Sequence, residues 1–459
     1  MEHVPLGEAR APVDQVQDYL DRETRPVPAY LRDDSYVYLG SADLPVSRWL
    51  SRDFFEREMR HVWPHVWQLA CVADDVATVG DYVTYDIGDH SFIVVREAAD
   101  SIRAYYNSCL HRATKLATGQ GHARAFKCPF HGWVYGLNGR ITGLPCAWDF
   151  EHLTDRTLPE IRVATWQGLV FVCMDPAAPS LADYIGPIDA AFERYPLTAK
   201  HKSAHVEKVV PGNWKIGLEQ FIESYHVFGT HPEALPYIGD ANTEYCIWPD
   251  NDHVSRMHAL HSVSSPHVGD RYSQQDMMDL ITAISDKAGA DAERIVVPDG
   301  VTTRQILGEK RRRLLADLGL DVSHLTDAEM IDTIHYFIFP NIVVWTAYGS
   351  PMIYRFRPNG MDHESHVMEV IFLTPYDARA PKPAPAPVTK LGYEQSWTEA
   401  PELGKLGWVF DQDVGNAHLV LAGLKASGKK TVTLANYQEV RIRHYHRTID
   451  KYIERGEAE

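Results

Sequence analysis

The chain has 459 residues, of which 45% are hydrophobic, 23% charged and 11% aromatic, a composition typical of a globular protein with two or three domains. Its formal net charge of −17 is not offset by any basic tract, which argues against a nucleic-acid or anionic-membrane partner. Six scattered cysteines, an N-terminus without a secretory signal and the lack of a clean membrane span favour a soluble protein of the reducing cytoplasm.

The strand and helix patterns divide the chain into three parts. Residues 1–65 form a polar lead followed by a helix that begins near Ser51. Short strand-like runs separated by turns occupy 66–175 and predict an all-β domain. Strands and helices alternate over 176–459, where the expected elements lie at 205–210, 213–230, 270–330, 336–347, 350–358, 365–375 and 432–455. We therefore predict an α+β protein in which segment 1–65 packs on the C-terminal domain.

Two short motifs in the all-β part carry thiols and imidazoles at close spacing. One supplies Cys109 and His111, and the other supplies Cys128 and His131. Two thiolates and two imidazoles are the ligand set of a Rieske [2Fe–2S] cluster, in which the cysteines hold one iron and the histidines the other. A structural zinc site takes the same four ligands. The spacing alone leaves both interpretations open.

The residues around these motifs, NSCLHRA (107–113) and CPFHGWVY (128–135), closely resemble the Rieske domain of ring-hydroxylating, non-haem iron oxygenases. The resemblance implies a cluster rather than zinc. Pro129 and Gly132 would shape a loop that brings backbone N–H groups toward the cluster sulfurs, and Trp133 would shield the cluster from water. The family usually has Gly where Ala113 stands, and many members have Tyr where Phe130 stands, but neither departure touches a ligand.

A second group of candidate ligands follows in ESYHVFGTH (223–231). Two histidines and a carboxylate with open positions form the facial triad of non-haem Fe(II) oxygenases. Glu223 and His226 share a helix face, being three residues apart. His226 and His231 are five residues apart, about 140° on an ideal helix, so both reach one metal only if the helix ends or widens near Gly229.

This segment resembles the same family. The resemblance implies that His226 and His231 bind the mononuclear iron, and that Glu223 bridges an iron-ligand histidine and a cluster histidine of an adjacent subunit. Asp413 matches the carboxylate ligand of the family, and Asp411 is the fallback; either aspartate alone would be read as a helix cap. Dihydroxylating members usually have Asp at the position of Glu223, and one more residue separates that Asp from the preceding aromatic residue. The Glu at this position therefore favours monooxygenation.

Three other signals are set aside. The segment GLKASGKK (423–430) nearly matches a phosphate-binding loop, but Lys430 stands where Ser or Thr must reach Mg²⁺. His444 and His446 are expected on a solvated, basic helix face. The remaining candidates, His258, His261 and His267, are each interpreted as structural.

The resemblance covers nearly the whole chain and implies the terminal oxygenase (alpha) subunit of a Rieske oxygenase system, with a helix-grip (START-like) catalytic domain after the Rieske domain. It implies O₂ as co-substrate, NAD(P)H electrons from a separate reductase with or without a ferredoxin, and a head-to-tail homotrimer with or without a beta subunit. The expected reaction is hydroxylation or oxidative demethylation of an aromatic or apolar organic molecule, with cis-dihydroxylation as the alternative. A Rieske-type electron carrier is the alternative of another class, but such carriers need a membrane anchor and lack a second iron site.

Overall fold

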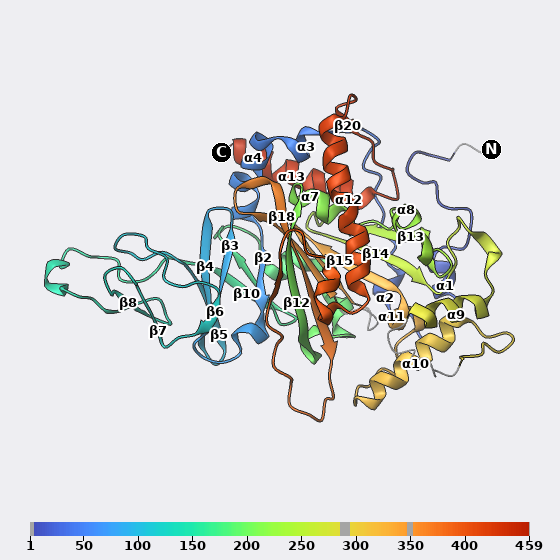
Figure 1. Cartoon of the computed structure of the whole chain (residues 1–459), viewed down its shortest axis with the longest axis horizontal. Coiled ribbons are helices and arrows are strands. Elements are labelled where there is room, and N and C mark those ends of the chain that lie inside the picture. The colour runs from blue at the N-terminus through green and yellow to red at the C-terminus, as the bar shows by residue number, and fades with distance from the viewer. Residues whose placement is uncertain (1–3, 285–293, 347–351, 459) are drawn as a thin grey trace. The chain divides into compact units, whose positions relative to one another are not determined.

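The computed structural model describes residues 4–284, 294–346 and 352–458 (Figure 1). These residues fall into two compact units. The smaller unit comprises 56–183 with 358–362 and the end of the chain from 452, and the larger comprises the chain up to 55, 184–357 and 363–451. The boundaries between the two compact units lie after residues 55 and 183. The domain division predicted from the sequence, 1–65, 66–175 and 176–459, remains a prediction.

The smaller unit is built on a seven-stranded antiparallel sheet. Residues 92–95 of β4 form a continuous apolar run and are all fully buried. Such a run is typical of a strand that is covered on both faces, so the core of this unit lies around β4. The strands, in spatial order, are β2 (Gln68–Val72), β11 (Leu169–Cys173), β10 (Glu160–Trp166), β5 (Ser101–Tyr106), β4 (His90–Ala98), β3 (Asp81–Ile87) and β6 (Gln120–His122). Two 3₁₀ turns, at 63–65 and 73–76, flank β2.

A second, three-stranded sheet in this unit holds one of the two cysteine loops. It consists of β7 (Ala125–Lys127), β8 (Val134–Gly136) and β9 (Ile141–Gly143). The loop with Cys128 joins β7 to β8, and the loop with Cys109 follows β5. Both cysteines lie in a buried cluster with Phe126, Trp133 and Tyr135, so each loop is held by the apolar core at its base.

The larger unit is built on an eight-stranded sheet, so the predicted α+β class is confirmed. Its strands, in spatial order, are β13 (Ile238–Ile247), β14 (Val254–His261), β15 (Thr333–Ile338), β16 (Ile342–Trp345), β17 (Met352–Asn359), β18 (Asp362–Pro375), β12 (Lys200–Pro211) and β19 (Thr389–Leu391). β12 pairs antiparallel with β18 along its whole length, and β19 adds to β12 in parallel. A separate short ladder joins β1 (Leu44–Pro45) to β20 (Thr431–Val432).

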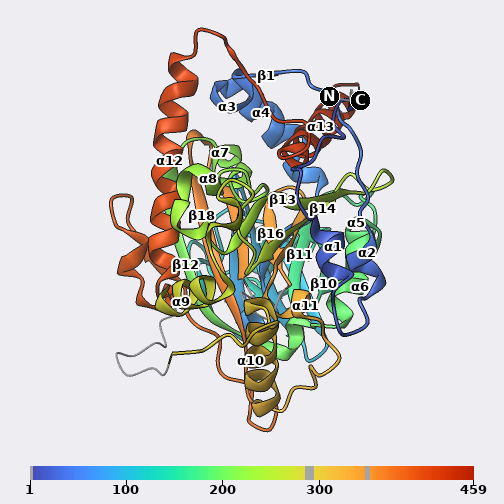
Figure 2. The ribbon, with the colours of Figure 1, turned by 90° about the vertical axis from the view of Figure 1, so that its right-hand side faces the viewer.

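Helices surround this sheet, and the longest, α12 (Leu406–Ala426), runs beside it (Figure 2). The other helices of this unit are α1 (Val16–Leu20), α2 (Ala29–Arg32), α3 (Ser47–Leu50), α6 (Asp189–Glu193), α7 (Trp214–Glu219), α8 (Val227–Thr230), α9 (Gln274–Ile284), α10 (Thr303–Asp317) and α11 (Asp327–Ile331). Three further helices, α4 (Arg52–His61), α5 (Leu181–Ile185) and α13 (Val440–Ala458), each contain residues of both units. α7 approaches the sheet closely at Gly217, where a Cβ would collide with the imidazole of His366 on β18. None of the described helices is long and apolar enough to cross a membrane.

The helix expected over 213–230 is broken, and this prediction was wrong. α7 ends at Glu219 and α8 begins only at Val227, so the break precedes Gly229. Side chains satisfy the backbone there: Tyr245 accepts a hydrogen bond from the N–H of Ser224 (3.0 Å), and Arg441 donates to the carbonyl of Ile222 (3.1 Å). Buried backbone groups outside a helix need such partners, and distant residues supply them here.

The expectation for His444 and His446 was also wrong. They lie on α13 and are buried, with 5% and 1% of their surface exposed, together with the fully buried Arg441. A polar partner replaces solvent at His446, whose Nε2 lies 2.8 Å from a carboxylate oxygen of Glu219, whereas Nδ1 of His444 is enclosed and unpaired. Buried polar groups are tolerated when they are paired, and the basic sequence pattern does not reveal that pairing.

Candidate metal centres

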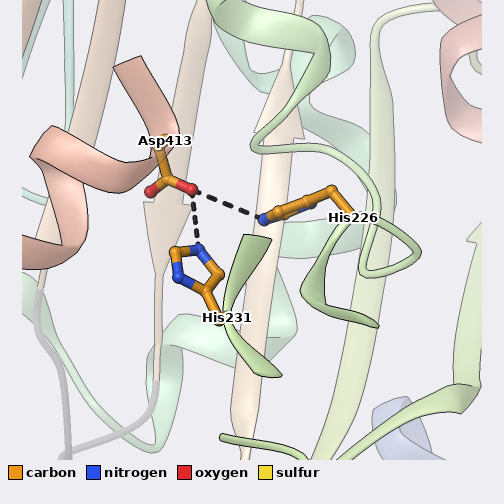
Figure 3. Close-up of side chains that lie close together, drawn as sticks. All are labelled: His226, His231 and Asp413. Carbon is orange, nitrogen blue, oxygen red and sulfur yellow. Dashed lines mark hydrogen bonds and ion pairs between the residues drawn. The ribbon is translucent and has the colours of Figure 1, made fainter. Parts of the chain in front are cut away.

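Two histidines and an aspartate converge in the larger unit (Figure 3). His226 lies at the end of the helix break, His231 ends α8, and Asp413 projects from the middle of α12. The Oδ1 atom of Asp413 is 2.7 Å from Nε2 of His231 and 3.6 Å from Nε2 of His226. One candidate ligand atom from each residue lies within 4.8 Å of the other two.

Each imidazole is oriented by a partner on its far nitrogen. The Nδ1–H of His226 donates to Oε1 of Glu223 (2.7 Å), and the Nδ1–H of His231 donates to Oε1 of Gln412 (3.0 Å). The amide of Gln412 in turn donates to Glu233 (3.3 Å). Such bonds set the ring tautomer and leave Nε2 available as a ligand.

The electrostatics of the site are dominated by its carboxylates. Burial disfavours the charged form of His226, but Glu223 and Asp413 outweigh burial and raise the pKa of His226 to about 9. Glu223 and Asp413 are themselves buried, with 7% and 3% of their surface exposed. The negative field of the two carboxylates, which favours a proton on His226, equally favours a divalent cation, whose binding releases that proton.

The donor set fits ferrous iron. Two imidazole nitrogens and one carboxylate oxygen form the facial triad, which leaves coordination positions for other molecules. Asp411 is directed elsewhere: its Oδ1 accepts the N–H of Trp397 (3.0 Å), and its other oxygen accepts the hydroxyl of Ser396. The structure therefore brings Asp413, and not Asp411, to the two histidines.

A cavity of about 720 Å³ opens beside the triad. Its wall is mostly apolar, and it is lined on the sheet side by Met257, Ala259, Thr333, His335, Trp345, Met352 and Tyr354, and on the helix side by Phe221, Val227, Trp408, Val409 and Phe410. A cavity of this size and polarity is typical of a site for a small organic ligand.

In the smaller unit, the two loops carry the four motif residues 109, 111, 128 and 131. The rings of His111 and His131 have their centroids 4.5 Å apart, and the ring of Trp133 stacks on His111 at 5.1 Å. Both cysteines are buried. Phe130 is exposed to 54% of its surface, so the side chain that replaces the family's usual Tyr points to solvent.

Hydrogen-bond donors surround the two sulfurs. The hydroxyl of Tyr135 lies 3.2 Å from Sγ of Cys109 and accepts the N–H of Leu110 (2.9 Å). Burial raises the pKa of the Cys128 thiol, but the backbone N–H groups of Phe130 and His131 reverse this effect, so the net pKa is lowered. Two thiolates with such donors and two neighbouring imidazoles fit a Rieske cluster.

Two glycine-like turns shape these loops. Ala113 has a positive φ of 56°, and Gly132 has a φ of 75°. The N–H of each donates back to the carbonyl of the cysteine four residues earlier, at 2.9 and 3.1 Å. The turn at Ala113 thus adopts the left-handed conformation in spite of its Cβ, at a cost of about 1 kcal/mol.

Two domain families match the chain. Residues 66–159 match the Rieske [2Fe-2S] domain, and residues 192–455 match the ring hydroxylating alpha subunit (catalytic domain). Together they describe a Rieske domain followed by the catalytic domain of a ring-hydroxylating alpha subunit. The chain belongs to the family of ring-hydroxylating oxygenase alpha subunits, and the Rieske cluster and mononuclear iron predicted from the sequence are the cofactors of this family.

Curated relatives match only part of the chain. The oxygenase subunit of glycine betaine monooxygenase from Chromohalobacter salexigens is 32% identical over 199 residues, 43% of this chain and 44% of the relative. The large oxygenase component of the naphthalene 1,2-dioxygenase system from Pseudomonas fluorescens is 32% identical over 260 residues, 53% and 57% of the two chains. The chain thus matches about half the length of these relatives.

Solved structures share the fold over nearly the whole chain. The quaternary ammonium Rieske monooxygenase CntA, bound to L-carnitine, superposes with a TM-score of 0.62 over 92% of this chain and 97% of its own, at 15% identity. Naphthalene 1,2-dioxygenase with indole bound gives a TM-score of 0.61 over 92% and 94%, at 18% identity. At this identity the likeness establishes the fold alone.

Sequence reasoning missed three residues that the structure places at these centres. Gln412 orients His231, Tyr135 contacts the sulfur of Cys109, and His335 lines the cavity. Gln412 lies between Asp411 and Asp413, so its place in that motif was an available signal. Tyr135 ends the motif CPFHGWVY (128–135), which gave it a place but no role, and His335 lies in a strand outside every motif.

Proposed function

We propose that the chain is the terminal oxygenase component of a Rieske non-haem iron oxygenase system, which uses O₂ and NAD(P)H-derived electrons to hydroxylate or oxidatively demethylate an apolar organic substrate. The observation that carries this proposal is the convergence of His226, His231 and Asp413 beside a mostly apolar cavity. A facial triad next to a substrate-sized space is the arrangement that oxygen insertion requires.

The proposed roles follow from the contacts of each side chain. His226, His231 and Asp413 hold ferrous iron, which supplies O₂ activation when it is bound. The four residues of the cysteine loops, Cys109, His111, Cys128 and His131, hold the [2Fe–2S] cluster, which supplies one-electron transfer when it is bound. Gln412 keeps Nε2 of His231 available to the metal. The apolar wall excludes water from the reacting carbon.

Glu223 is proposed as the carboxylate that links the two centres. It already accepts two hydrogen bonds from His226, one from Nδ1–H at 2.7 Å and one from the backbone N–H at 2.9 Å. By the family resemblance its second contact is a cluster histidine of a neighbouring subunit. A carboxylate between two imidazoles fixes both tautomers and gives a hydrogen-bonded path for electrons.

The surface beside Glu223 supports assembly into a head-to-tail homotrimer. Tyr225 and Phe228 are exposed to 53% and 51% of their surface. In the smaller unit, which carries the two cysteine loops, Phe130 and Trp148 are exposed to 54% and 75%. Exposed aromatic side chains of this size mark surfaces that bind a partner. A beta subunit, a reductase and a ferredoxin are further proposed partners on family grounds, and the free thiols of all six cysteines suit the reducing cytoplasm.

The proposed substrate is an aromatic or otherwise apolar organic molecule, and the proposed outcome is monooxygenation. The apolar cavity wall supports the substrate class, and Glu223 in place of the usual Asp supports the outcome. The second candidate is cis-dihydroxylation, favoured by the 260-residue match to a naphthalene 1,2-dioxygenase component. Within the family both reactions use the same donor set, so the ligands do not discriminate between them.

The test is turnover of a panel of aromatic substrates under ¹⁸O₂, with a surrogate reductase and ferredoxin. Hydroxylation gives one labelled atom per product molecule, and dihydroxylation gives two. Oxidative demethylation releases the inserted oxygen in formaldehyde, which is measured separately. A protein that accepts electrons but neither labels a product nor releases formaldehyde, while the reductase control stays active, would be an electron carrier and would contradict the proposed function.

A further inference from the structure

The sheet wall of the cavity carries one histidine among apolar neighbours. His335 lies on β15 two residues from Thr333, so the two side chains share a face. Its partners directly across the strands are Met257 on β14 and Trp345 on β16. All four residues line the cavity. His335 therefore stands in the middle of the wall that a bound substrate would touch.

The imidazole of His335 has no hydrogen bond to the described residues. Its Nδ1 is enclosed and unpaired, and only 1% of the residue's surface is exposed. Neighbouring groups do not serve it: Met257 offers only a thioether, and the indole Nε1 of Trp345, with ring centroids 5.3 Å apart, is itself enclosed and unpaired. A buried polar group left without a partner costs about 1–3 kcal/mol.

Other buried histidines of the same sheet each have one ring nitrogen paired inside the protein. Nε2 of His258 lies 2.8 Å from Asp332, Nε2 of His205 lies 2.9 Å from Glu369, and Nδ1 of His366 donates to the carbonyl of Gly212 at 2.8 Å. The second nitrogen of each of these rings is enclosed and unpaired, as Nδ1 of His335 is. His335 differs in that neither of its nitrogens has a partner among the described residues and in that a cavity lies beside it.

The ring of His335 is neutral, with a single N–H. Burial, reinforced by the charge of Arg441, lowers the pKa of His335 well below its usual value. An enclosed N–H without a partner is costlier than an enclosed lone pair, so the proton is expected on Nε2, which is not among the enclosed unpaired atoms of the described residues. The imidazole then presents a neutral donor to the cavity.

We propose that His335 is a substrate-positioning residue, whose Nε2–H donates a hydrogen bond to an uncharged oxygen acceptor (a carbonyl, ether or hydroxyl) on an otherwise apolar substrate. The inference rests on the proposed function and narrows its substrate class. An anionic acceptor is disfavoured, because the cavity is lined by the carboxylates of Glu223, Glu233 and Asp413 and by one ammonium group, Lys405. The bond would fix which carbon of the substrate lies nearest the triad.

The test measures binding without turnover, using the oxidised holoenzyme kept free of reductant. The probes are 1-indanone, which has a carbonyl, and indane, which has the same carbon skeleton and no acceptor. Their dissociation constants are measured by titration calorimetry for the wild type and for H335F. Because a hydrogen bond contributes about 1 kcal/mol net, we expect H335F to reduce the 1-indanone-to-indane affinity ratio by about 5-fold and to leave indane affinity nearly unchanged.

Two further variants separate a specific bond from a general loss of polarity. H335N retains an N–H donor and is expected to recover part of the ratio. T333V removes a hydroxyl from the same wall and is expected to leave the ratio unchanged. Circular dichroism and iron content show whether each variant is folded and loaded, and H335L replaces H335F if the larger ring prevents folding.

Three results would overturn the assignment: equal losses for both probes in H335F, a loss in T333V as large as in H335F, or no binding of either probe to the wild type. The outcome is independent of the oxygenase proposal. If H335F shifts the affinity ratio but the protein labels no product under ¹⁸O₂, the role of His335 in binding stands and the proposed reaction is rejected. If products are labelled but the ratio is unshifted in H335F, the proposed reaction stands and the role of His335 is rejected.

Discussion

The two proposed metal centres of this chain are assembled in opposite ways. The candidate cluster ligands come from two loops close together in the sequence, at residues 109–111 and 128–131, each held by a short strand and a buried aromatic core. The proposed mononuclear site combines His226 and His231, from a broken helix, with Asp413 from a helix nearly two hundred residues later. The first centre depends on local turn geometry, and the second on the tertiary fold.

This difference decides what perturbs each centre. The cluster centre responds to changes in the backbone conformation of its loops and in the hydrogen-bond donors to its sulfurs. The triad responds to any change in the packing of α12 beside the segment 220–231. Loss of a triad ligand is therefore expected to have a larger effect than a change in the backbone of a cluster loop.

The largest effect is expected from removing the distant ligand. D413A takes away the carboxylate that lies 2.7 Å from His231, and two imidazoles alone hold ferrous iron weakly. We expect product formation to fall at least about 10³-fold, as is typical for loss of a metal or nucleophilic centre, while the visible absorption of the cluster is unchanged. Product is measured by mass spectrometry with a surrogate reductase.

The matched control is D411A, two residues away on the same helix. Asp411 accepts hydrogen bonds from Ser396 and Trp397, so its loss is expected to cost about 1 kcal/mol of stability and to leave product formation within a few-fold. Equal losses in D411A and D413A would contradict the assignment of the ligand.

A smaller effect is expected at the residue proposed to link the centres. E223Q keeps the size of the side chain but removes the charge that orients His226, and loss of such an orienting partner typically costs about 10–100-fold in activity or metal affinity. Stopped-flow oxidation of the reduced cluster in the presence of substrate and O₂ measures the electron-transfer step.

Glu233 provides the comparison for this variant. It contacts Gln412 at 3.3 Å and no histidine more closely than 4.0 Å, so E233Q is expected to change the same rate less than about 3-fold. A rate in E223Q equal to that of the wild type would remove Glu223 from the electron path.

The cluster itself is expected to respond to loss of a single donor. Y135F removes the hydroxyl that lies 3.2 Å from Sγ of Cys109. A donor to sulfur stabilises the more negative, reduced cluster, so its loss is expected to lower the reduction potential by about 60 mV, a tenfold change for one electron. Protein-film voltammetry measures the shift, and Y82F, which alters a tyrosine packed on the same core, is expected to leave the potential unchanged.

The smallest effect is expected at the backbone of the cysteine loops. A113G relieves the strain of a Cβ at φ 56° and is expected to stabilise the loaded domain by about 1 kcal/mol, whereas G132A introduces that strain at φ 75° and destabilises it by a similar amount. Thermal loss of the cluster absorbance follows both changes. Shifts of the same sign in the two variants would show that turn strain does not control this centre.

The same contrast explains what could be predicted from the sequence. The cysteine and histidine motifs are local, so their loops and the surrounding all-β domain were predictable, and the family match confirms the Rieske domain. Asp413 was assigned from its motif, because no local pattern links residues 226 and 413. The break at 220–226 was not predicted, since its backbone partners Tyr245 and Arg441 lie on β13 and α13.

Buried polar residues were the main source of error. His444 and His446 have the sequence signature of a basic surface, yet both are buried inside the larger unit, where His446 pairs with Glu219. His335 carries no signature at all, because an isolated histidine in an apolar strand is compatible with a satisfied core residue. Only the unpaired ring beside a cavity distinguishes it.

Metal analysis of the anaerobically purified protein shows whether this chain holds two different iron centres. We expect about three iron ions and about two acid-labile sulfides per chain, with a Rieske signal in electron paramagnetic resonance after reduction. In D413A the iron count is expected to fall to about two while the sulfide count stays the same. A wild-type protein with zinc in place of iron and sulfide, or with only the cluster iron, would contradict the account.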